Sequence, residues 1–158
     1  MTVPGINARH PAWWISTWFG VGLLPKFPGT WGSIAALPFA WLIQASWGPL
    51  GLLIAAAIVT AIGIWAAGVY CDRSGENDPQ RIVADEVAGQ WLALSAAAMT
   101  LSDFALGFIL FRIFDILKPW PASWADRSLH GGWGVMLDDV AAGAYAALCL
   151  LAVRYFVG

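Results

Sequence analysis

Two pairs of adjacent carboxylates, Asp85–Glu86 and Asp138–Asp139, have the residue types and spacing that suit a metal site. Each pair lies near the beginning of an apolar stretch, where the positive end of a helix would offset part of the repulsion between the charges. Neighbouring carboxylates still favour a bound cation. From the local sequence alone, the alternative for each pair is a set of solvated acids in the first turn of a helix.

The segment 111–121 combines acidic and basic residues at a regular interval. Arg112, Asp115 and Lys118 recur every three residues, so a helix would carry them on one slanted stripe. Pro119 would end that helix, because a proline disfavours helical geometry in the residue before it. Two cations beside one acid suit an anion site that also holds a metal ion. The alternative is a cluster of long side chains that reach toward water from a helix end at the membrane surface.

Two glycine-containing segments, 28–33 and 130–134, are candidates for phosphate contacts, because glycine lets backbone amides approach an anion closely. The first predicts a turn followed by a helix that Thr30 or Ser33 caps, and Thr30 is the candidate phosphate ligand. The second predicts a glycine-rich turn between His130 and the paired aspartates that open the last helix, and His130 could carry a proton. The alternatives are an ordinary cap, a flexible loop and a polar histidine at the membrane surface.

Several carboxylates beside two or three cations favour Mg²⁺, an ion that binds carboxylates, water and substrate phosphate. The candidate metal ligands are Asp85, Glu86, Asp115, Asp138 and Asp139. Cys71 and Cys149 form no spacing typical of structural zinc. A Cys-x5-Arg phosphatase loop is absent, because Asn77 stands where its arginine would be, and an Asp-x-Asp-x-Thr nucleophile motif is absent too. Metal-assisted hydrolysis is the phosphatase chemistry that remains.

The composition predicts a membrane protein. The 158 residues are 59% hydrophobic and 11% charged, whereas about a quarter of a typical soluble domain is charged. So many apolar side chains cannot all fit in one small core, and a bilayer is the simplest solvent for the rest. The net charge of -2 gives no electrostatic support for nucleic-acid binding. Several of the eleven tryptophans flank apolar runs or crowd residues 11–20, which we interpret as a segment at the membrane interface.

Five apolar stretches predict an all-α integral membrane bundle of about four to five membrane helices, built as a single domain over residues 1–158. The stretches are residues 33–44, 47–70, 83–100, 104–117 and 140–156. The first is short, and it could either cross the membrane fully or re-enter on the same face. In both cases the polar segments converge on one side.

The distribution of charge predicts which side that is. If all five stretches cross, the connecting segments 22–32, 71–86 and 115–139 share one face. That face carries every basic residue except Arg154 and every acidic residue except Asp103. The positive-inside rule therefore puts the polar face in the cytoplasm.

The motifs taken together resemble the phosphatidylglycerophosphatase A family. The segments that carry the resemblance, in the family's order, are 22–25, 28–33, 82–86, 111–121 and 130–143. They span most of the chain, from about Gly20 to Gly143. The resemblance implies an enzyme of the bacterial inner membrane that depends on Mg²⁺. Its substrate would be phosphatidylglycerophosphate in the cytoplasmic leaflet, and its products phosphatidylglycerol and phosphate.

The resemblance also implies roles for particular residues. The family's acidic positions match the five candidate metal ligands, and Asp78 falls near a further acid of the family. The catalytic candidates are Asp85, Asp115, Asp139, Lys118, Arg112 and His130. Thr30, Arg112 and Lys118 are the candidate phosphate-binding residues.

The mechanism inferred from the sequence is in-line hydrolysis assisted by one or two Mg²⁺ ions. Arg112 and Lys118 would neutralise developing charge, and His130 would protonate the leaving oxygen. The nucleophile could be water or an aspartate that becomes phosphorylated. The alternative function is a small transporter or ion-pathway subunit, because carboxylates in membrane proteins often relay protons or ions. A non-enzymatic assembly factor is a third hypothesis, and the oligomeric state is left open.

Overall fold

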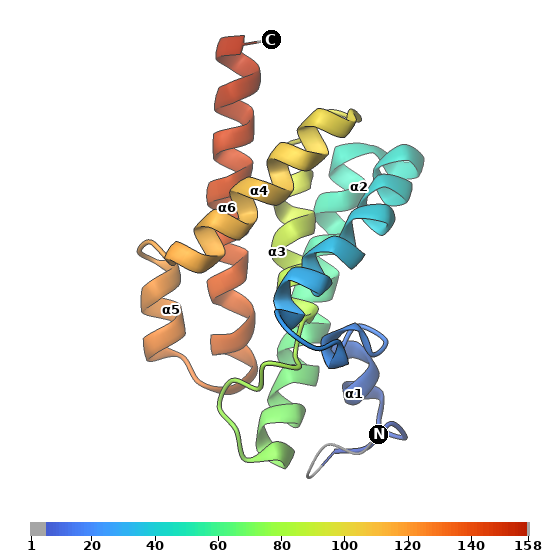
Figure 1. Ribbon diagram of the computed structural model, residues 1–158, viewed down its shortest axis with the longest axis vertical. Helices are drawn as coiled ribbons and strands as arrows, with labels where there is room; N and C mark the ends of the chain where they lie inside the picture. Colours follow the sequence, from blue (N-terminus) through green and yellow to red (C-terminus); the bar gives the residue numbers. More distant parts are fainter. Residues whose placement is uncertain (1–5, 158) are drawn as a thin grey trace.

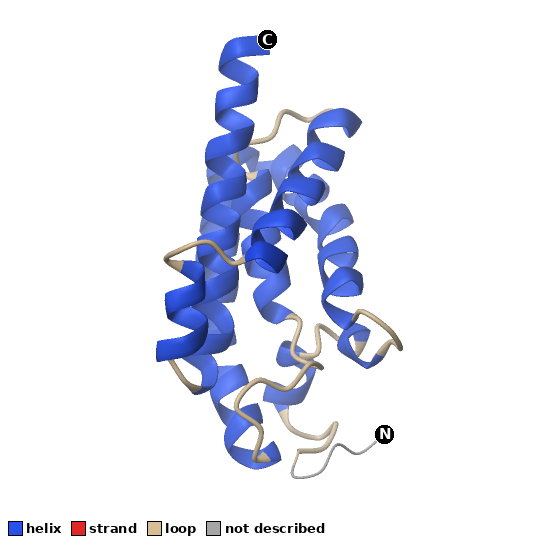
Figure 2. Ribbon diagram, turned by 60° about the vertical axis from the view of Figure 1, so that its left-hand side comes forward, coloured by secondary structure: helices blue, strands red, loops and turns tan. Residues whose placement is uncertain are grey.

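The fold is all-helical, as the apolar stretches predict. The computed structural model describes residues 6–157, and no β-strand forms in that range (Figure 2). In chain order the elements are α1 (Pro11–Ser16), the short 3-10 helix η1 (Val21–Leu23), α2 (Pro28–Ser74), α3 (Ala84–Leu94), α4 (Leu101–Leu117), α5 (Ala122–Ser128) and α6 (Gly131–Val157).

The longest element, α2, is a hairpin of two helical arms that meet at Gly48. Gly48 has φ +70° and ψ -174°, a conformation open mainly to glycine. Figure 1 shows the first arm, blue to cyan, rising to this reversal and the second, cyan to green, descending from it. The predicted stretches 33–44 and 47–70 therefore form two arms joined by a tight turn. Each arm reaches the roughly 20 residues that a membrane-crossing helix needs.

Helix α3 lies at the centre of the bundle, packed against both α2 and α6 (Figure 1). Two side-chain hydrogen bonds connect α3, and the turn that follows α3, to the first arm of α2. The Trp91 indole donates to the Ala36 carbonyl at 2.9 Å, and the Gln44 amide donates to the Ala97 carbonyl at 2.8 Å. Both contacts are buried, so they fix the position of α3 along the hairpin.

Glycines let α3 and α6 approach backbone to backbone. A Cβ on Gly89 would lie 2.5 Å from the Asp139 carbonyl, and a Cβ on Gly143 would overlap the Gly89 carbonyl. This contact lies within one turn of Glu86 on α3 and directly beside Asp139 on α6. The close packing thus brings two acidic segments together that are more than fifty residues apart in sequence.

By length and composition, α2 and α6 could each cross a membrane. Large apolar side chains also cover the outer surface, among them Leu42, Leu101 and Leu148, which are all more than 60% exposed. The stretch 83–100 differs from expectation, because its helix α3 has only 11 residues. At about 1.5 Å per residue it is about 16 Å long, about half of a hydrocarbon core. The number of four to five membrane helices therefore stays a prediction.

The expected N-terminal surface segment, 11–20, contains α1. Buried Trp13 packs α1 against the second arm of α2, where Ala66 and Tyr70 belong to the same apolar cluster. Neighbouring Trp14 is 42% exposed. Its contact with a membrane surface stays a prediction.

Candidate active site

A polar pocket of about 560 Å³ opens where four segments of the chain meet. Its wall is formed by the N-terminus of α2, the segment 78–86 that leads into α3, the last turns of α4 and the paired aspartates of α6. The residues that line it and carry charge are Asp78, Asp85, Glu86, Arg112, Asp115, Lys118, Asp138 and Asp139. Seven of these eight are residues that the sequence singled out as site candidates, so the tertiary structure brings the separate motifs into one site.

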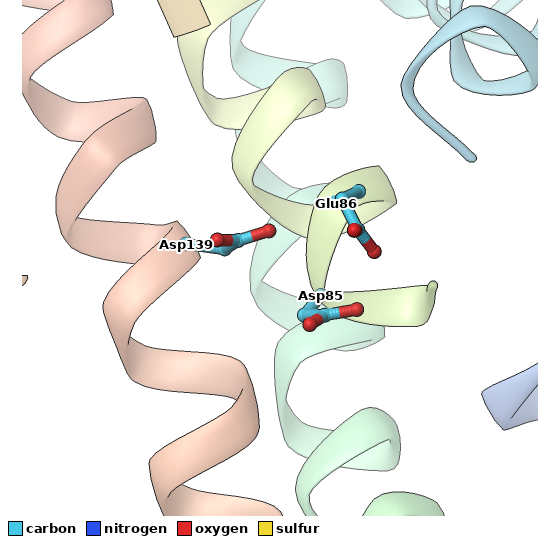
Figure 3. Close-up of side chains that lie close together, drawn as sticks. All are labelled: Asp85, Glu86 and Asp139. Atoms are coloured by element: carbon cyan, nitrogen blue, oxygen red, sulfur yellow. The ribbon is translucent and has the colours of Figure 1, made fainter. Parts of the chain in front are cut away.

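Three carboxylates form the centre of this pocket. Asp85 and Glu86 project from the first turn of α3 and face Asp139 of α6 (Figure 3). One oxygen of each lies within 4.8 Å of the others. The start of α3 contributes a positive helix end beside Asp85 and Glu86, which reduces part of the repulsion between the charges.

The carboxylate cluster fits a metal ion. Asp85 Oδ1, Glu86 Oε2 and Asp139 Oδ2 are buried and have no hydrogen-bond partner among the described residues. A buried anionic oxygen without a partner is costly, and a bound cation would remove that cost for all three at once. The donor set is oxygen only, which suits a hard divalent ion and excludes a thiolate or imidazole site at this cluster.

Arg112 is the basic residue of α4, and it lines the pocket beside this cluster. Its Nη1 lies 2.6 Å from Asp115 Oδ2, one turn further along the helix, and 3.5 Å from Ser33 Oγ of α2. Arg112 is therefore directed across the pocket toward the start of α2. Asp115 is paired with this guanidinium and lies beside the group of three carboxylates whose oxygens are within 4.8 Å of one another.

Gly29 brings the N-terminus of α2 against the same site. A Cβ at this position would overlap Glu86 Oε1 and lie 3.4 Å from Arg112 Nη1. Only a residue without a side chain fits there while Glu86 and Arg112 keep their positions. The sequence indicated the segment 28–33 for its glycines, but as a turn with a side-chain cap. The structure instead has helix from Pro28, with no side-chain cap at Phe27.

Lys118 directly follows α4 and joins two acids of other helices. Its ammonium donates to Asp138 Oδ2 of α6 and, at 2.7 Å, to Asp126 Oδ1 of α5. Burial by itself would lower the pKa of Lys118, but the hydrogen bonds and charges of these two carboxylates outweigh it and hold the pKa above its ordinary value. Lys118 is therefore a permanent counterion for Asp138, whose other oxygen accepts from the Asp139 amide at 2.9 Å.

Two predicted site residues lie outside the main pocket. His130 lines an adjoining pocket of about 160 Å³, which shares Asp78 and Asp138 with the main one. Thr30 lies in the first turn of α2, next to Gly29, but does not line either pocket. The expected glycine-rich turn after His130 is wrong, because Gly131 begins α6 and Asp138 and Asp139 lie two turns inside that helix. Gly132 is instead used for packing, since its Cβ would overlap the Ile64 carbonyl of α2.

The sequence missed Asp126 as a member of the site. It lies eight residues after Lys118, beyond two prolines and in a different helix, so no helical spacing connects the two. Asp78 had only the resemblance to support it and is present in the pocket wall.

Comparison with known proteins identifies the family. The model of phosphatidylglycerophosphatase A matches residues 14–154, which is nearly the whole chain. The chain belongs to the phosphatidylglycerophosphatase A family. The resemblance carried by the motifs is thereby confirmed.

Two curated relatives carry the name phosphatidylglycerophosphatase A, and a third carries the name of another lipid phosphatase. Phosphatidylglycerophosphatase A of Escherichia coli (strain K12) is 39% identical over 157 residues, covering 97% of this chain and 87% of the relative. The protein of that name from Haemophilus influenzae (strain Rd) is 34% identical over 153 residues, covering 96% and 94%. A relative from Bacteroides thetaiotaomicron, whose name proposes a phosphatidylinositol-3-phosphatase, is 37% identical over 157 residues, covering 91% and 94%. No solved structure matches the chain.

Membership of the phosphatidylglycerophosphatase A family makes this chain a phosphatase, as the motifs predicted. It does not favour the small transporter that was the alternative. The polar pocket, with its cluster of buried carboxylates and its paired cations, is the candidate active site of this phosphatase.

Proposed function

We propose that the chain hydrolyses phosphatidylglycerophosphate to phosphatidylglycerol and inorganic phosphate, in glycerophospholipid biosynthesis. One observation carries the proposal. Three buried carboxylate oxygens without partners lie together in a pocket that also contains Arg112, in a member of a family named for this reaction. The charge pattern suits a doubly ionised phosphate monoester, which needs cations on several sides.

Asp85, Glu86 and Asp139 would hold the divalent ion, with Asp115 and Asp138 bordering the same space. We propose Mg²⁺, because it binds through a few carboxylates and keeps positions for water and substrate phosphate. When bound, it would supply charge that polarises the phosphate ester and favours ionisation of an attacking water.

The side chains around the cluster have separate proposed roles. Arg112, held by Asp115, would neutralise charge that develops on the transferring phosphoryl group. Lys118 would keep Asp138 ionised and oriented and add positive charge at the edge of the pocket. Thr30, next to the pocket-lining Gly29, remains a proposed phosphate contact.

Proton transfer and the attacking group are further parts of the proposal. His130 would protonate the leaving glycerol oxygen from the adjoining pocket, across the boundary formed by Asp78 and Asp138. The attacking group is either water or a carboxylate of the pocket. Hydroxylamine trapping of a phosphorylated aspartate during turnover distinguishes the two.

We also propose a location in the bacterial cytoplasmic membrane, with the pocket at the cytoplasmic face and four to five helices in the bilayer. Support comes from the two helices long enough to cross and from the exposed apolar surface. The concentration of basic residues on the side of the pocket favours the cytoplasmic orientation. The named relatives are bacterial proteins.

The test is phosphate release by the detergent-purified chain, with Mg²⁺ or with EDTA. Phosphatidylglycerophosphate is compared with phosphatidic acid and phosphatidylinositol 3-phosphate. We expect Mg²⁺-dependent release that is at least tenfold faster, by kcat/KM, from phosphatidylglycerophosphate. Faster release from phosphatidylinositol 3-phosphate would favour the activity in the name of the Bacteroides relative. Absence of release from all three lipids would reject the proposal.

A further inference from the structure

We propose that an apolar groove between the first arm of α2 and α4 binds an acyl chain of the lipid substrate. This inference rests on the proposed function, because it assigns the hydrocarbon part of the molecule whose phosphate enters the polar pocket. The groove has a volume of about 390 Å³. Leu37, Pro38 and Trp41 line it from α2, and the residues that line it from α4 are equally apolar.

The groove lies beyond the active site along the same faces of both helices. On α2, Leu37 and Trp41 follow Gly29 and Ser33 in steps of four residues, which keeps them on adjoining parts of one face. On α4, Phe108, Ala105 and Leu101 precede Arg112 in steps of four, three and four residues. A ligand whose phosphate lies beside Arg112 therefore meets the groove directly beyond it.

Side-chain contacts connect the two helices at both ends of this path. Near the pocket, Arg112 Nη1 lies 3.5 Å from Ser33 Oγ. At the far end, the rings of Trp41 and Phe104 pack edge to face with their centroids 4.9 Å apart. Between these contacts only apolar side chains line the space, so a polar head group would lose its hydration there without any replacement.

The distance from the polar pocket to the far end of the groove suits one leaflet. From Gly29 to Trp41 the first arm of α2 rises about 18 Å at about 1.5 Å per residue. Half of a hydrocarbon core of about 30 Å is about 15 Å. The groove is also open on its outer side, where Leu101 is 82% exposed, so a chain can enter sideways from the bilayer. These features fit an acyl chain better than a water-soluble substrate.

A second apolar groove on the α2 hairpin provides a matched control. It has a volume of about 410 Å³ and is lined by Trp47, Ala55 and other residues of the segment 47–58. Its lining residues lie beside the reversal of the hairpin at Gly48, whereas the polar pocket is lined by the start of α2 at Phe27–Gly29. Ala105→Trp fills the proposed groove, and Ala55→Trp adds the same bulk to the control groove.

We expect Ala105→Trp to lower kcat/KM for long-chain phosphatidylglycerophosphate at least tenfold, mainly through KM. Turnover of the deacylated head group, glycerophosphoglycerol phosphate, should stay within twofold of the unsubstituted chain. Ala55→Trp should stay within twofold for both substrates. Equal effects of the two substitutions on the long-chain lipid would overturn the groove assignment, and so would an Ala105→Trp variant that loses both substrates equally.

Photolabelling of the unsubstituted chain tests the same inference without a folding risk. The probe is phosphatidylglycerophosphate with a diazirine in one acyl chain, used in vesicles that contain excess phosphatidylethanolamine. Expected labels fall within 37–41 and 101–108 and are suppressed by unlabelled phosphatidylglycerophosphate. Labels elsewhere, or labels in the groove that the unlabelled lipid does not suppress, would overturn the inference. Absence of phosphate release from the unsubstituted chain would instead reject the proposed function, so the two failures are distinct.

Discussion

The ammonium of Lys118, which follows the last residue of α4, is hydrogen-bonded to Asp138, a buried carboxylate in the third turn of α6. Asp126 of α5 accepts from the same ammonium at 2.7 Å. One lysine thus connects three helices at the wall of the candidate active site. Its contact with Asp138 adds a charge partner directly next to Asp139, which is a proposed metal ligand.

Removal of the Lys118 ammonium should affect turnover more than folding. We expect Lys118→Met to lower kcat about 10²-fold, because Asp138 then lacks its cation and repels the neighbouring carboxylates. Lys118→Arg should recover part of the loss. Steady-state kinetics with phosphatidylglycerophosphate measures both. The control is Lys26→Met, at an exposed loop position that does not line the pocket, and it should have full activity. If Lys118→Met were as active as this control, Lys118 would have no role in the site.

Neutralising one carboxylate of the central cluster should change metal binding and stability in opposite directions. We expect Asp139→Asn to weaken Mg²⁺ binding by about 10²-fold or more and to lower kcat at least as far. In EDTA the same variant should be more stable than the unsubstituted chain, since it removes a buried charge without a partner. The measurement is the melting temperature in detergent, with and without Mg²⁺.

The control for this experiment is Asp72→Asn, an exposed carboxylate near the end of α2. It should keep the full Mg²⁺-dependent rise in melting temperature. If Mg²⁺ raised the melting temperature of the Asp139→Asn variant as much as that of the unsubstituted chain, the ion would bind elsewhere.

A single methyl group at Gly29 should damage the site without unfolding the chain. The new Cβ in Gly29→Ala overlaps Glu86 Oε1, so Glu86 must leave its present position in the carboxylate cluster. We expect kcat to fall between about 10- and 10²-fold, in line with the loss from small misplacements of catalytic groups. Gly68→Ala, in the second arm of the same helix, meets its nearest atom at 3.8 Å and should be neutral or slightly stabilising. Equal activities of the two variants would exclude a steric requirement at Gly29.

The role of His130 has a distinct kinetic signature. If it protonates the leaving oxygen, His130→Gln should lower kcat by about 10²-fold or more and remove the basic limb of the pH–rate profile. A structural histidine in the adjoining pocket would lower the rate with an unchanged profile. The profile of kcat between about pH 5 and 9 therefore decides whether His130 belongs to the reaction.

Much of the fold followed from local patterns. Apolar stretches predicted the helices, and Pro119 correctly predicted the end of α4, which stops at Leu117. Asp85 and Glu86 were correctly expected in the first turn of a helix. Boundaries failed where glycines had been interpreted as a turn, because Gly132 and Gly134 are helical and serve close packing. Local propensity favours a turn at such sites, and tertiary contacts override it.

By itself, the sequence determined the family and with it the phosphatase class, because residue types, their spacing and their order are read directly from the chain. It could not decide which carboxylates meet. That depended on how closely α3 and α6 approach at Gly89 and Gly143, which unites Asp85, Glu86 and Asp139 and leaves Asp115 and Asp138 paired with cations. The lysine that appeared available for phosphate is bound by Asp126, a residue that no spacing connects to it. Such pairings arise between distant segments, so only the packed helices decided them.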